Sequence, residues 1–466
     1  MKKIYMGVMI GAFLTTGCKK LVEVPPPVTQ LVTSSVFNNN YTATAALTDI
    51  YSNMDGESLG MEVYTGWSGD ELIDYSGGSG SIYHNALTAE NDGSSLQFWS
   101  TFYQYIYRAN AVLEGLQGQH GVSPSVSNQL SGEALLIRAF WYFYLVNMYG
   151  DVPLVLSTDY NVNRMAARVT KDKVYEQMVT DLNRADSLLS SNFVDATDTA
   201  TTTERVRPNQ STAQALLARV YLYKGDYPQA EAAASAVIAD SRFVLLSDLT
   251  QVFLKNSQET IWALMPTPTT YHTGEGGFLT LTAAPANATY ATAFSTRMMS
   301  AFEPQDKRRA IWIDSINALG QTFYYPSKYK ADFTSTTQTE YPIMLRLSEQ
   351  YLIRAEARAW QNNLTGANSD VSDLNAIRNR AGLSPYSGGT DRTSLLNAIS
   401  HERQVELFTE WCDRWFNLKR TGVVDSLMTI VTPEKGGQGW APYQALYPIK
   451  ITDLQTDPNL TQTPGY

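Results

Sequence analysis

The sequence is poor in the residue types that most often carry chemistry. Among its 466 residues only two are cysteine and four are histidine. Two cysteines, Cys18 and Cys412, cannot form a disulfide framework. None of the histidines stands in a spacing typical of a metal site or of nucleophilic catalysis, and the chain has neither a P-loop nor a G-x-S-x-G motif. The usual signatures of zinc proteins, nucleotide hydrolases and serine hydrolases are therefore absent.

Positive charge and long hydrophobic runs are also scarce. The chain has 35 Lys and Arg against 45 Asp and Glu, a formal net charge of -10. Nucleic acids and anionic membrane surfaces are bound through Lys and Arg, so this balance argues against a nucleic-acid partner. Outside the central segment described next, the longest apolar run is residues 4–14. This is about half of the roughly 20 residues that a membrane-spanning helix needs.

Residues 132–155, GEALLIRAFWYFYLVNMYGDVPLV, form the segment around which the chain is organised. From 134 to 149 it is apolar on nearly every side, so a helix here has no solvent face and must lie inside a larger helical assembly. Glu133 is expected in its first turn, and a buried Arg138 would need a partner. Gly150 tolerates the positive φ of a helix end.

Much of the remaining chain has helical periodicity. Residues 207–240 place Ala218, Ala230 and Ala234 around a Gly225 turn, close to the spacing of a tetratricopeptide repeat. Small side chains let two helices approach closely, and glycine permits the turn between them. We therefore predict an all-α fold, a tetratricopeptide-like helical scaffold built from packed helix pairs.

Two stretches break this pattern, near residues 54–93 and 266–342. Both are rich in glycine or threonine and carry many aromatic rings. Long irregular loops inside a compact domain are usually functional or disordered, and the aromatic rings favour a function. We predict two large irregular insertions that display a binding surface on the helical scaffold.

The N-terminal residues are typical of an export signal. Two lysines, an apolar stretch and small residues precede Cys18, which resembles a bacterial lipoprotein signal over residues 1–17 with Cys18 as the acylated residue. Residues 18–36 contain three consecutive prolines, which favour a stiff polyproline II tether. The helical domain is expected over residues 37–466.

Four segments carry a more specific signal. They are the central segment GEALLIRAFWYFYLVNMYGDVPLV, then IMLRLSEQYLIRAEARAW, HERQVELFTEWCDRWFNLKRTG and the C-terminal YPIKITDLQTDPNLTQTPGY. They resemble signatures of the SusD/RagB family and occur in the family's order. The departures are Trp411, Cys412 and Asp413 in place of small residues, Lys450 in place of proline and Thr463 in place of asparagine. The resemblance covers residues 18–466.

The resemblance implies a lipid-anchored outer-membrane protein that captures a nutrient, most often a glycan, and passes it to a SusC-like TonB-dependent transporter. It implies no enzyme activity, cofactor or metal. Aromatic rings offer flat apolar platforms to the C–H faces of sugars. Each ring in the insertions can serve as a platform or simply pin its own loop to the scaffold. The candidate ligand-binding residues are Trp67, Tyr75, Tyr83, Tyr271, Phe278, Tyr324 and Tyr325.

Two other functions stay open at this point, a peptide-binding member of the same family and a surface glycosidase. The segment His401-Glu402-Arg403-Gln404-Val405 lacks the second histidine of a zinc-protease helix. We expect Glu402, Glu406, Glu410 and Arg414 to share one helix face, with Glu410 and Arg414 as an ordinary i, i+4 pair. Lys19 and Lys20 lack the acidic character of many surface-export signals, so the cell-surface and periplasmic orientations also both stay open.

Metabolic labelling with palmitate tests the lipid anchor. We expect label in the wild type and none in Cys18→Ala, because the thiol is the acylation site of a lipoprotein signal. Equal labelling of the two proteins would refute the assignment.

Overall fold

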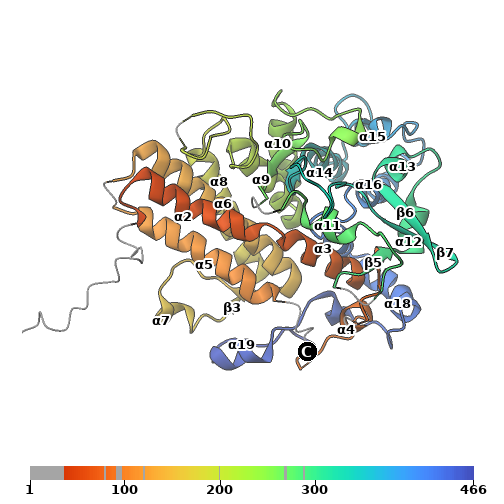
Figure 1. Ribbon diagram of the computed structural model, residues 1–466, viewed down its shortest axis with the longest axis horizontal. Helices are drawn as coiled ribbons and strands as arrows, with labels where there is room; N and C mark the ends of the chain where they lie inside the picture. Colours follow the sequence, from red (N-terminus) through yellow and green to blue (C-terminus); the bar gives the residue numbers. More distant parts are fainter. Residues whose placement is uncertain are drawn as a thin grey trace, which may run out of the picture.

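A computed structural model describes residues 36–77, 80–90, 97–118, 121–198, 200–266, 270–286 and 289–466. The expected signal peptide, Cys18 and all of the expected tether except Val36 lie outside the described residues. Helices make up most of the described chain, and its strands occur in pairs (Figure 1). The prediction of a mainly helical, tetratricopeptide-like scaffold is confirmed.

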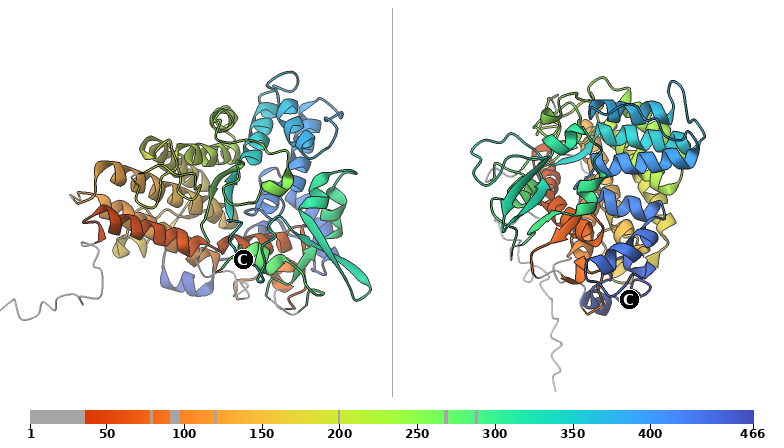
Figure 2. Two further views of the ribbon diagram at one scale, coloured as in Figure 1. Left: turned by 45° about the horizontal axis from the view of Figure 1, so that its top comes forward. Right: turned by 90° about the vertical axis from the view of Figure 1, so that its right-hand side faces the viewer.

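Nine helices of the described chain form the scaffold, and successive ones pack against each other. Figure 2 shows them stacked beside one another, with the hairpin β6 (Ile313–Ala318) and β7 (Gln321–Pro326) projecting from the body. The nine are α2 (Asn40–Met54), α5 (Phe98–Leu116), α6 (Pro124–Tyr149), α8 (Lys171–Leu188), α9 (Gln210–Lys224), α10 (Tyr227–Ile238), α14 (Leu347–Trp360), α15 (Asp370–Arg380) and α16 (Arg392–Glu406).

The remaining helices and the strands join and cover the scaffold. Strand β1 (Leu72–Asp74) pairs with β5 (Thr292–Phe294), and β2 (Val152–Pro153) pairs with β3 (Arg168–Val169). Strand β4 (Thr260–Ala263) pairs with β8 (Ile343–Arg346). The remaining helices are α3 (Glu57–Ser68), α4 (Gly80–Tyr83), α7 (Tyr160–Asn163), α11 (Gly274–Leu279), α12 (Thr296–Ala301), α13 (Lys307–Ile311), α17 (Asp413–Arg420), α18 (Val424–Glu434) and α19 (Ile451–Thr456), with the 3-10 turns η2 (Leu249–Gln251) and η3 (Pro442–Ala445).

Helix α6 is the centre of the hydrophobic core, as its composition predicts. Residues 132–146 are all buried. Arg138 finds the partner that burial demands, because its Nε and Nη2 donate to the two carboxylate oxygens of Asp181 at 2.8 and 2.7 Å and its Nη1 donates to Asn110. Gly150 follows the helix with φ 75°.

The start of α6 differs from the sequence expectation. The helix begins nine residues before Glu133, so Glu133 lies in its middle and not in its first turn. The Glu133 carboxylate accepts hydrogen bonds from Arg207 Nε and Nη2 and from the hydroxyl of Tyr51. In the polar stretch before residue 132, Gln129 donates to the Pro208 carbonyl oxygen and accepts from the Ser190 N–H, and the sequence does not show these partners.

The pair α9 and α10 confirms the predicted repeat. Gly225 has φ 80° and ends α9, and α10 begins two residues later. Ala218, Ala230 and Ala234 are fully buried, as close approach of two helices requires.

The first expected insertion is not irregular throughout, and that part of the prediction is wrong. Its residues 57–68 form α3, and Ser58 to Ser68 are all buried. A Cβ on Gly66 would lie 2.7 Å from Leu72 Cδ1, so this glycine lets β1 pack closely on the helix. Burial of the helix outweighs the poor helix propensity of glycine here, so propensity alone wrongly predicts a loop.

The two insertions assemble with each other. Strand β1 of the first pairs antiparallel with β5 of the second, with Leu72 opposite Phe294. The second insertion leaves the scaffold after β4 and returns in β8, and these strands also pair with each other. Segments more than 200 residues apart in sequence therefore lie side by side next to the scaffold (Figure 1).

The expected helix face from Glu402 to Arg414 is interrupted. Helix α16 ends at Glu406, and Thr409, Trp411 and Cys412 all have positive φ, between 46° and 66°. Glu410 consequently pairs with Arg346 and Lys328, while Arg414 pairs with Asp70 at 2.7 Å. The predicted Glu410–Arg414 pair is wrong because the chain turns between the two residues.

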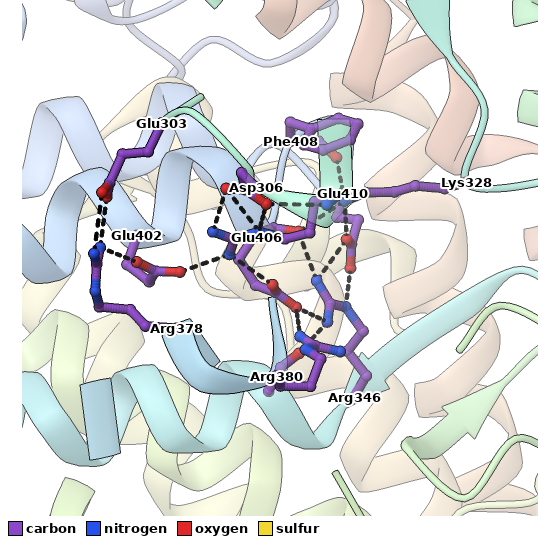
Figure 3. Close-up of polar contacts among 12 residues, drawn as sticks. Glu303, Asp306, Lys328, Arg346, Arg378, Arg380, Glu402, Glu406, Phe408 and Glu410 are labelled. Carbon is purple, nitrogen blue, oxygen red and sulfur yellow. Dashed lines mark hydrogen bonds and ion pairs between the residues drawn. The ribbon is translucent and has the colours of Figure 1, made fainter. Parts of the chain in front are cut away.

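A buried network of charges, drawn in Figure 3, joins the C-terminal half of the scaffold to the second insertion. Arg308 Nη1 lies 2.6 Å from Glu402 and 3.0 Å from Glu406. Glu406 also pairs with Arg346 at 2.5 Å and with Arg380. Burial alone would raise the pKa of Glu406, but Arg380, Arg346 and Arg308 outweigh burial and hold the pKa well below its usual range.

Removing the charge of Glu406 should destabilise the protein strongly. Glu406→Gln leaves three buried guanidinium groups short of one negative charge, and we expect a loss of about 3–5 kcal/mol in the free energy of unfolding. Denaturant unfolding measures it. The matched control is Glu434→Gln, whose partner Arg297 is 40% exposed and which should change stability by less than about 1 kcal/mol. A cost for Glu406→Gln as small as that of the control would contradict this account.

Candidate functional site

A continuous series of aromatic rings runs from the core to the surface of the paired insertions. Trp67 of α3 contacts Tyr64, with ring centroids 5.5 Å apart. Tyr64 contacts Tyr290 at 5.8 Å, and Tyr290 contacts Phe278 of α11 at 5.9 Å. Each ring fixes the next, so the outermost rings are held by the core.

At the outer end of this series the rings are open to solvent. Phe278 and Phe333 meet edge to face, with centroids 5.2 Å apart at 85°, and they are 46% and 62% exposed. His272 packs against Phe333 at 4.6 Å, and its neighbour Tyr271 is 45% exposed. We call Tyr271, His272, Phe278 and Phe333 the aromatic corner. Two perpendicular rings and their neighbours offer an apolar surface of fixed shape.

Glycine makes this arrangement possible. Thr273 caps α11 by accepting a hydrogen bond from the Gly276 N–H at 3.0 Å. A Cβ on Gly276 would lie 2.2 Å from the Ala331 carbonyl oxygen, and one on Gly277 would lie 2.6 Å from the His272 ring. Glycine at 276 therefore allows the segment that carries Phe333 to lie directly on α11, and glycine at 277 leaves room for the rings of His272 and Phe333.

Two carboxylates hold the segment that carries Phe333. Glu340 accepts hydrogen bonds from the backbone N–H groups of Lys330 and Ala331, the latter at 2.9 Å. Asp332 accepts from both the N–H and the hydroxyl of Thr334. Burial raises the pKa of Glu340, whereas the hydrogen bonds from Thr334 lower the pKa of Asp332. The polar groups on either side of Phe333 are thus engaged in fixing the backbone.

A second group of rings lies where the first insertion meets the hairpin. Tyr75 follows β1 and packs edge to face on Phe323 of β7, with centroids 5.6 Å apart. Tyr83 lies under the ammonium group of Lys435, which is 5.2 Å from the ring centroid. Burial raises the pKa of Tyr83 to about 12.

The structure thus separates the seven predicted ligand-binding residues. Phe278 and Tyr271 are exposed at the aromatic corner, and Tyr75 and Tyr83 are half-buried in the second group. Tyr324 is half-buried on the opposite face of β7, where the guanidinium of Arg309 lies 5.4 Å from its ring.

Two of the seven do not form a ligand platform in this structure. Trp67 is fully buried, and its indole N–H donates to Thr292 Oγ1 at 3.2 Å. Tyr325 is 7% exposed. Both rings pin their own segment, which is the alternative role that the sequence left open. Their candidate role as ligand platforms does not fit this burial, because α3 and β7 turn them inward.

The sequence reasoning missed Phe333, which is the most exposed ring of the aromatic corner, and its neighbour His272. A signal was present, because Phe333 stands as a single aromatic residue in the polar sequence ADFTSTT. A lone large apolar residue among turn-forming residues is a candidate for exposure.

Groups that could carry hydrolytic chemistry near α16 are engaged in structure. Glu402 and Glu406 are fully buried and paired with arginines. His401 Nε2 lies 2.8 Å from the Ala301 carbonyl oxygen. Across the part of the chain that the structure describes, no three His, Cys, Asp or Glu side chains gather as ligands for a metal ion, and no helix has the length and apolarity to span a membrane.

Two family models match the chain. Residues 30–222 match a SusD-like model described as "Starch-binding associating with outer membrane", and residues 312–466 match the SusD family model. SusD-like protein P2 of Formosa agariphila is 25% identical over the whole length of both chains. The fold and these matches define a helical, SusD-type protein.

Solved structures agree with that class. A SusD superfamily protein of Bacteroides thetaiotaomicron is 23% identical and superposes with a TM-score of 0.77 over 91% of this chain and 100% of its own. A laminarin-binding SusD-like protein is 22% identical, with a TM-score of 0.73 over 92% and 99% of the two chains. The chain belongs to the SusD/RagB family.

Replacing Gly276 tests how the aromatic corner is held. We expect Gly276→Ala to lower the free energy of unfolding by about 1–3 kcal/mol, because its Cβ overlaps the Ala331 carbonyl and something must shift. Gly80→Ala is the control, since a Cβ there meets His84 at an ordinary 3.6 Å. Chemical denaturation of both variants measures the difference, and equal stability would argue against close packing of α11 on residue 331.

Proposed function

We propose that this protein captures a glycan at the outer membrane, without catalysis, and delivers it to a SusC-like TonB-dependent transporter. The single observation that carries the proposal is the aromatic corner, where Phe278 and Phe333 are exposed and yet fixed by rings that reach the core. Sugar rings present apolar C–H faces, and rigid aromatic side chains cover such faces at little cost in conformational entropy.

Family membership supports the rest of the proposal. One matched family model is described as starch-binding and associated with the outer membrane, and one structural neighbour is described as laminarin-binding. A lipid at Cys18 would hold the protein at the outer membrane, facing outward. There the protein would act as the lid of its transporter. The carboxylates of Glu402 and Glu406 in α16 form ion pairs with arginines, which favours binding over hydrolysis as the function.

Tyr75, Tyr83 and Tyr324 remain candidate contacts beside the aromatic corner. Tyr75 and Tyr83 belong to the surface made by the two paired insertions, and a long glycan could extend over both ring groups. Each is half-buried, so each offers an edge and a hydroxyl and not a whole ring face.

Removing rings of the aromatic corner should weaken glycan binding. Isothermal titration of the chain from residue 19 against laminarin, starch oligosaccharides, plant and host glycans and mixed peptides should show saturable heat for one glycan class without product formation. For that glycan we expect Phe333→Ala and Phe278→Ala each to lose at least about tenfold in affinity, about 1.4 kcal/mol.

The control for these variants is Tyr160→Ala in α7, since Tyr160 is 74% exposed and lies on a different element. Its affinity should equal that of the wild type. Unchanged affinity in both corner variants would remove the aromatic corner as the site, and a response to peptides alone would replace the glycan by a peptide.

A further inference from the structure

The loop between β2 and β3 exposes a cluster of apolar side chains. The two strands pair and close the base of the loop, and α7 lies within it. Single exposed apolar residues are ordinary on a protein surface, whereas a cluster of them marks a site of interaction. We call the cluster the apolar tip, and its members are Leu156, Tyr160, Val162 and Met165, which are 41%, 74%, 60% and 44% exposed.

Hydrogen bonds hold this loop in one conformation. Glu114 of α5 accepts from the backbone N–H of Thr158 at 2.8 Å. Asn163 Nδ2 donates to the Ser157 carbonyl oxygen, also at 2.8 Å. Polar backbone groups that already have partners within the protein can enter an apolar environment at little cost. The loop therefore displays its apolar side chains on a fixed backbone.

The apolar tip carries no net charge, in contrast to the whole chain. Within residues 154–167 the only charged residues are Asp159 and Arg164. The guanidinium of Arg164 lies 5.9 Å from the centroid of the Tyr160 ring. Tyrosine and arginine both place an apolar body in lipid and a polar end in water, which is why they are common at membrane interfaces. This composition favours a neutral lipid surface over a charged partner.

The described chain begins close to the same loop. A Cβ on Gly115 would lie 2.1 Å from Phe37 Cε2, so Phe37 packs directly on the C-terminal end of α5. The preceding residue, Glu114, is the one that holds the loop. Figure 1 shows α7 on the same side of the molecule as the start of α2. A lipid on Cys18, 18 residues before Val36, would keep the apolar tip within about 60 Å of the bilayer, the length of a fully extended chain.

We propose that the apolar tip inserts into the membrane that anchors the protein, at the boundary between headgroups and acyl chains. Elements that lie in this boundary bury their apolar side chains roughly 5–10 Å deep. The proposal rests on the lipid anchor at Cys18, which is part of the proposed function. A second contact beside the lipid fixes how the folded body is oriented on the membrane.

A fluorescent label on α7 tests the insertion. The chain from residue 19 carries an N-terminal hexahistidine tag and is held on phosphatidylcholine vesicles by a nickel-chelating lipid, so acylation of Cys18 is not needed. The environment-sensitive dye NBD is attached to Asn161→Cys, which is exposed, whereas Cys412 is buried. We expect at least about a twofold gain in fluorescence on the vesicles and quenching by brominated lipids, both independent of salt because the tip has no net charge.

An unchanged signal that brominated lipids do not quench would overturn the proposal and leave the apolar tip to a protein partner. The same dye on Ser426→Cys of α18 is the control for position, since Figure 1 shows α18 on the opposite side of the molecule. Its fluorescence should not change when the protein binds the vesicles.

Variants of the apolar tip locate the insertion. Tyr160→Ser combined with Val162→Ser should abolish the gain in fluorescence of the dye at position 161. Both side chains are exposed, so the unfolding midpoint should stay that of the wild type. The matched control is Ile430→Ser, which removes a 54% exposed side chain of α18 and should keep the full gain. Insertion by the double variant as strong as that of the wild type would refute the location.

The outcome is separable from the proposed function. The double variant should bind glycan with wild-type affinity in calorimetry, because the apolar tip and the aromatic corner lie on different elements. Failure of the lipid anchor appears in palmitate labelling, whereas failure of the insertion appears only on the vesicles.

Discussion

The pairing of Glu406 with three buried arginines is the interaction on which the rest of the structure depends. Arg308 comes from the second insertion, Arg346 from β8 and Arg380 from α15, so a single carboxylate joins three separate elements of the chain. Burying these charges is costly unless every one is paired. The network therefore demands one arrangement of these elements, and it fixes the base of the second insertion where β4 and β8 leave and rejoin the scaffold.

The aromatic series likewise has a buried end, which holds it in place, and an exposed end. Trp67 and Tyr64 belong to α3, which is buried against the scaffold, and the series ends at Phe333 in solvent. A surface ring that is held by contacts to the core loses little freedom when a ligand binds. The exposed rings are thus pre-organised by residues that never meet the ligand.

The sequence predicted the fold well where a local pattern decides it. The apolar run of α6, the Gly225 turn and the small residues of α9 and α10 define packed helices, and the structure has them. The prediction failed at α3, where glycines suggested a loop, and at Thr409 to Cys412, where a helical spacing of charges suggested a continuous helix. In both places tertiary contacts outweigh local preference. For the same reason the sequence indicated the aromatic rings only as a group. It could not show that Phe278 is exposed whereas Trp67 is buried.

By itself the sequence determined the helical scaffold, the position of its two ring-bearing insertions and the family to which the chain belongs, because hydrophobic periodicity, turn residues and ordered motifs are local properties. Only the tertiary structure decided which rings face solvent, that the two insertions pair through β1 and β5, and which partners Glu133, Glu406 and Glu410 take. These features depend on contacts between residues up to several hundred positions apart, and the free energy of burial and charge pairing selects them only once the chain is folded.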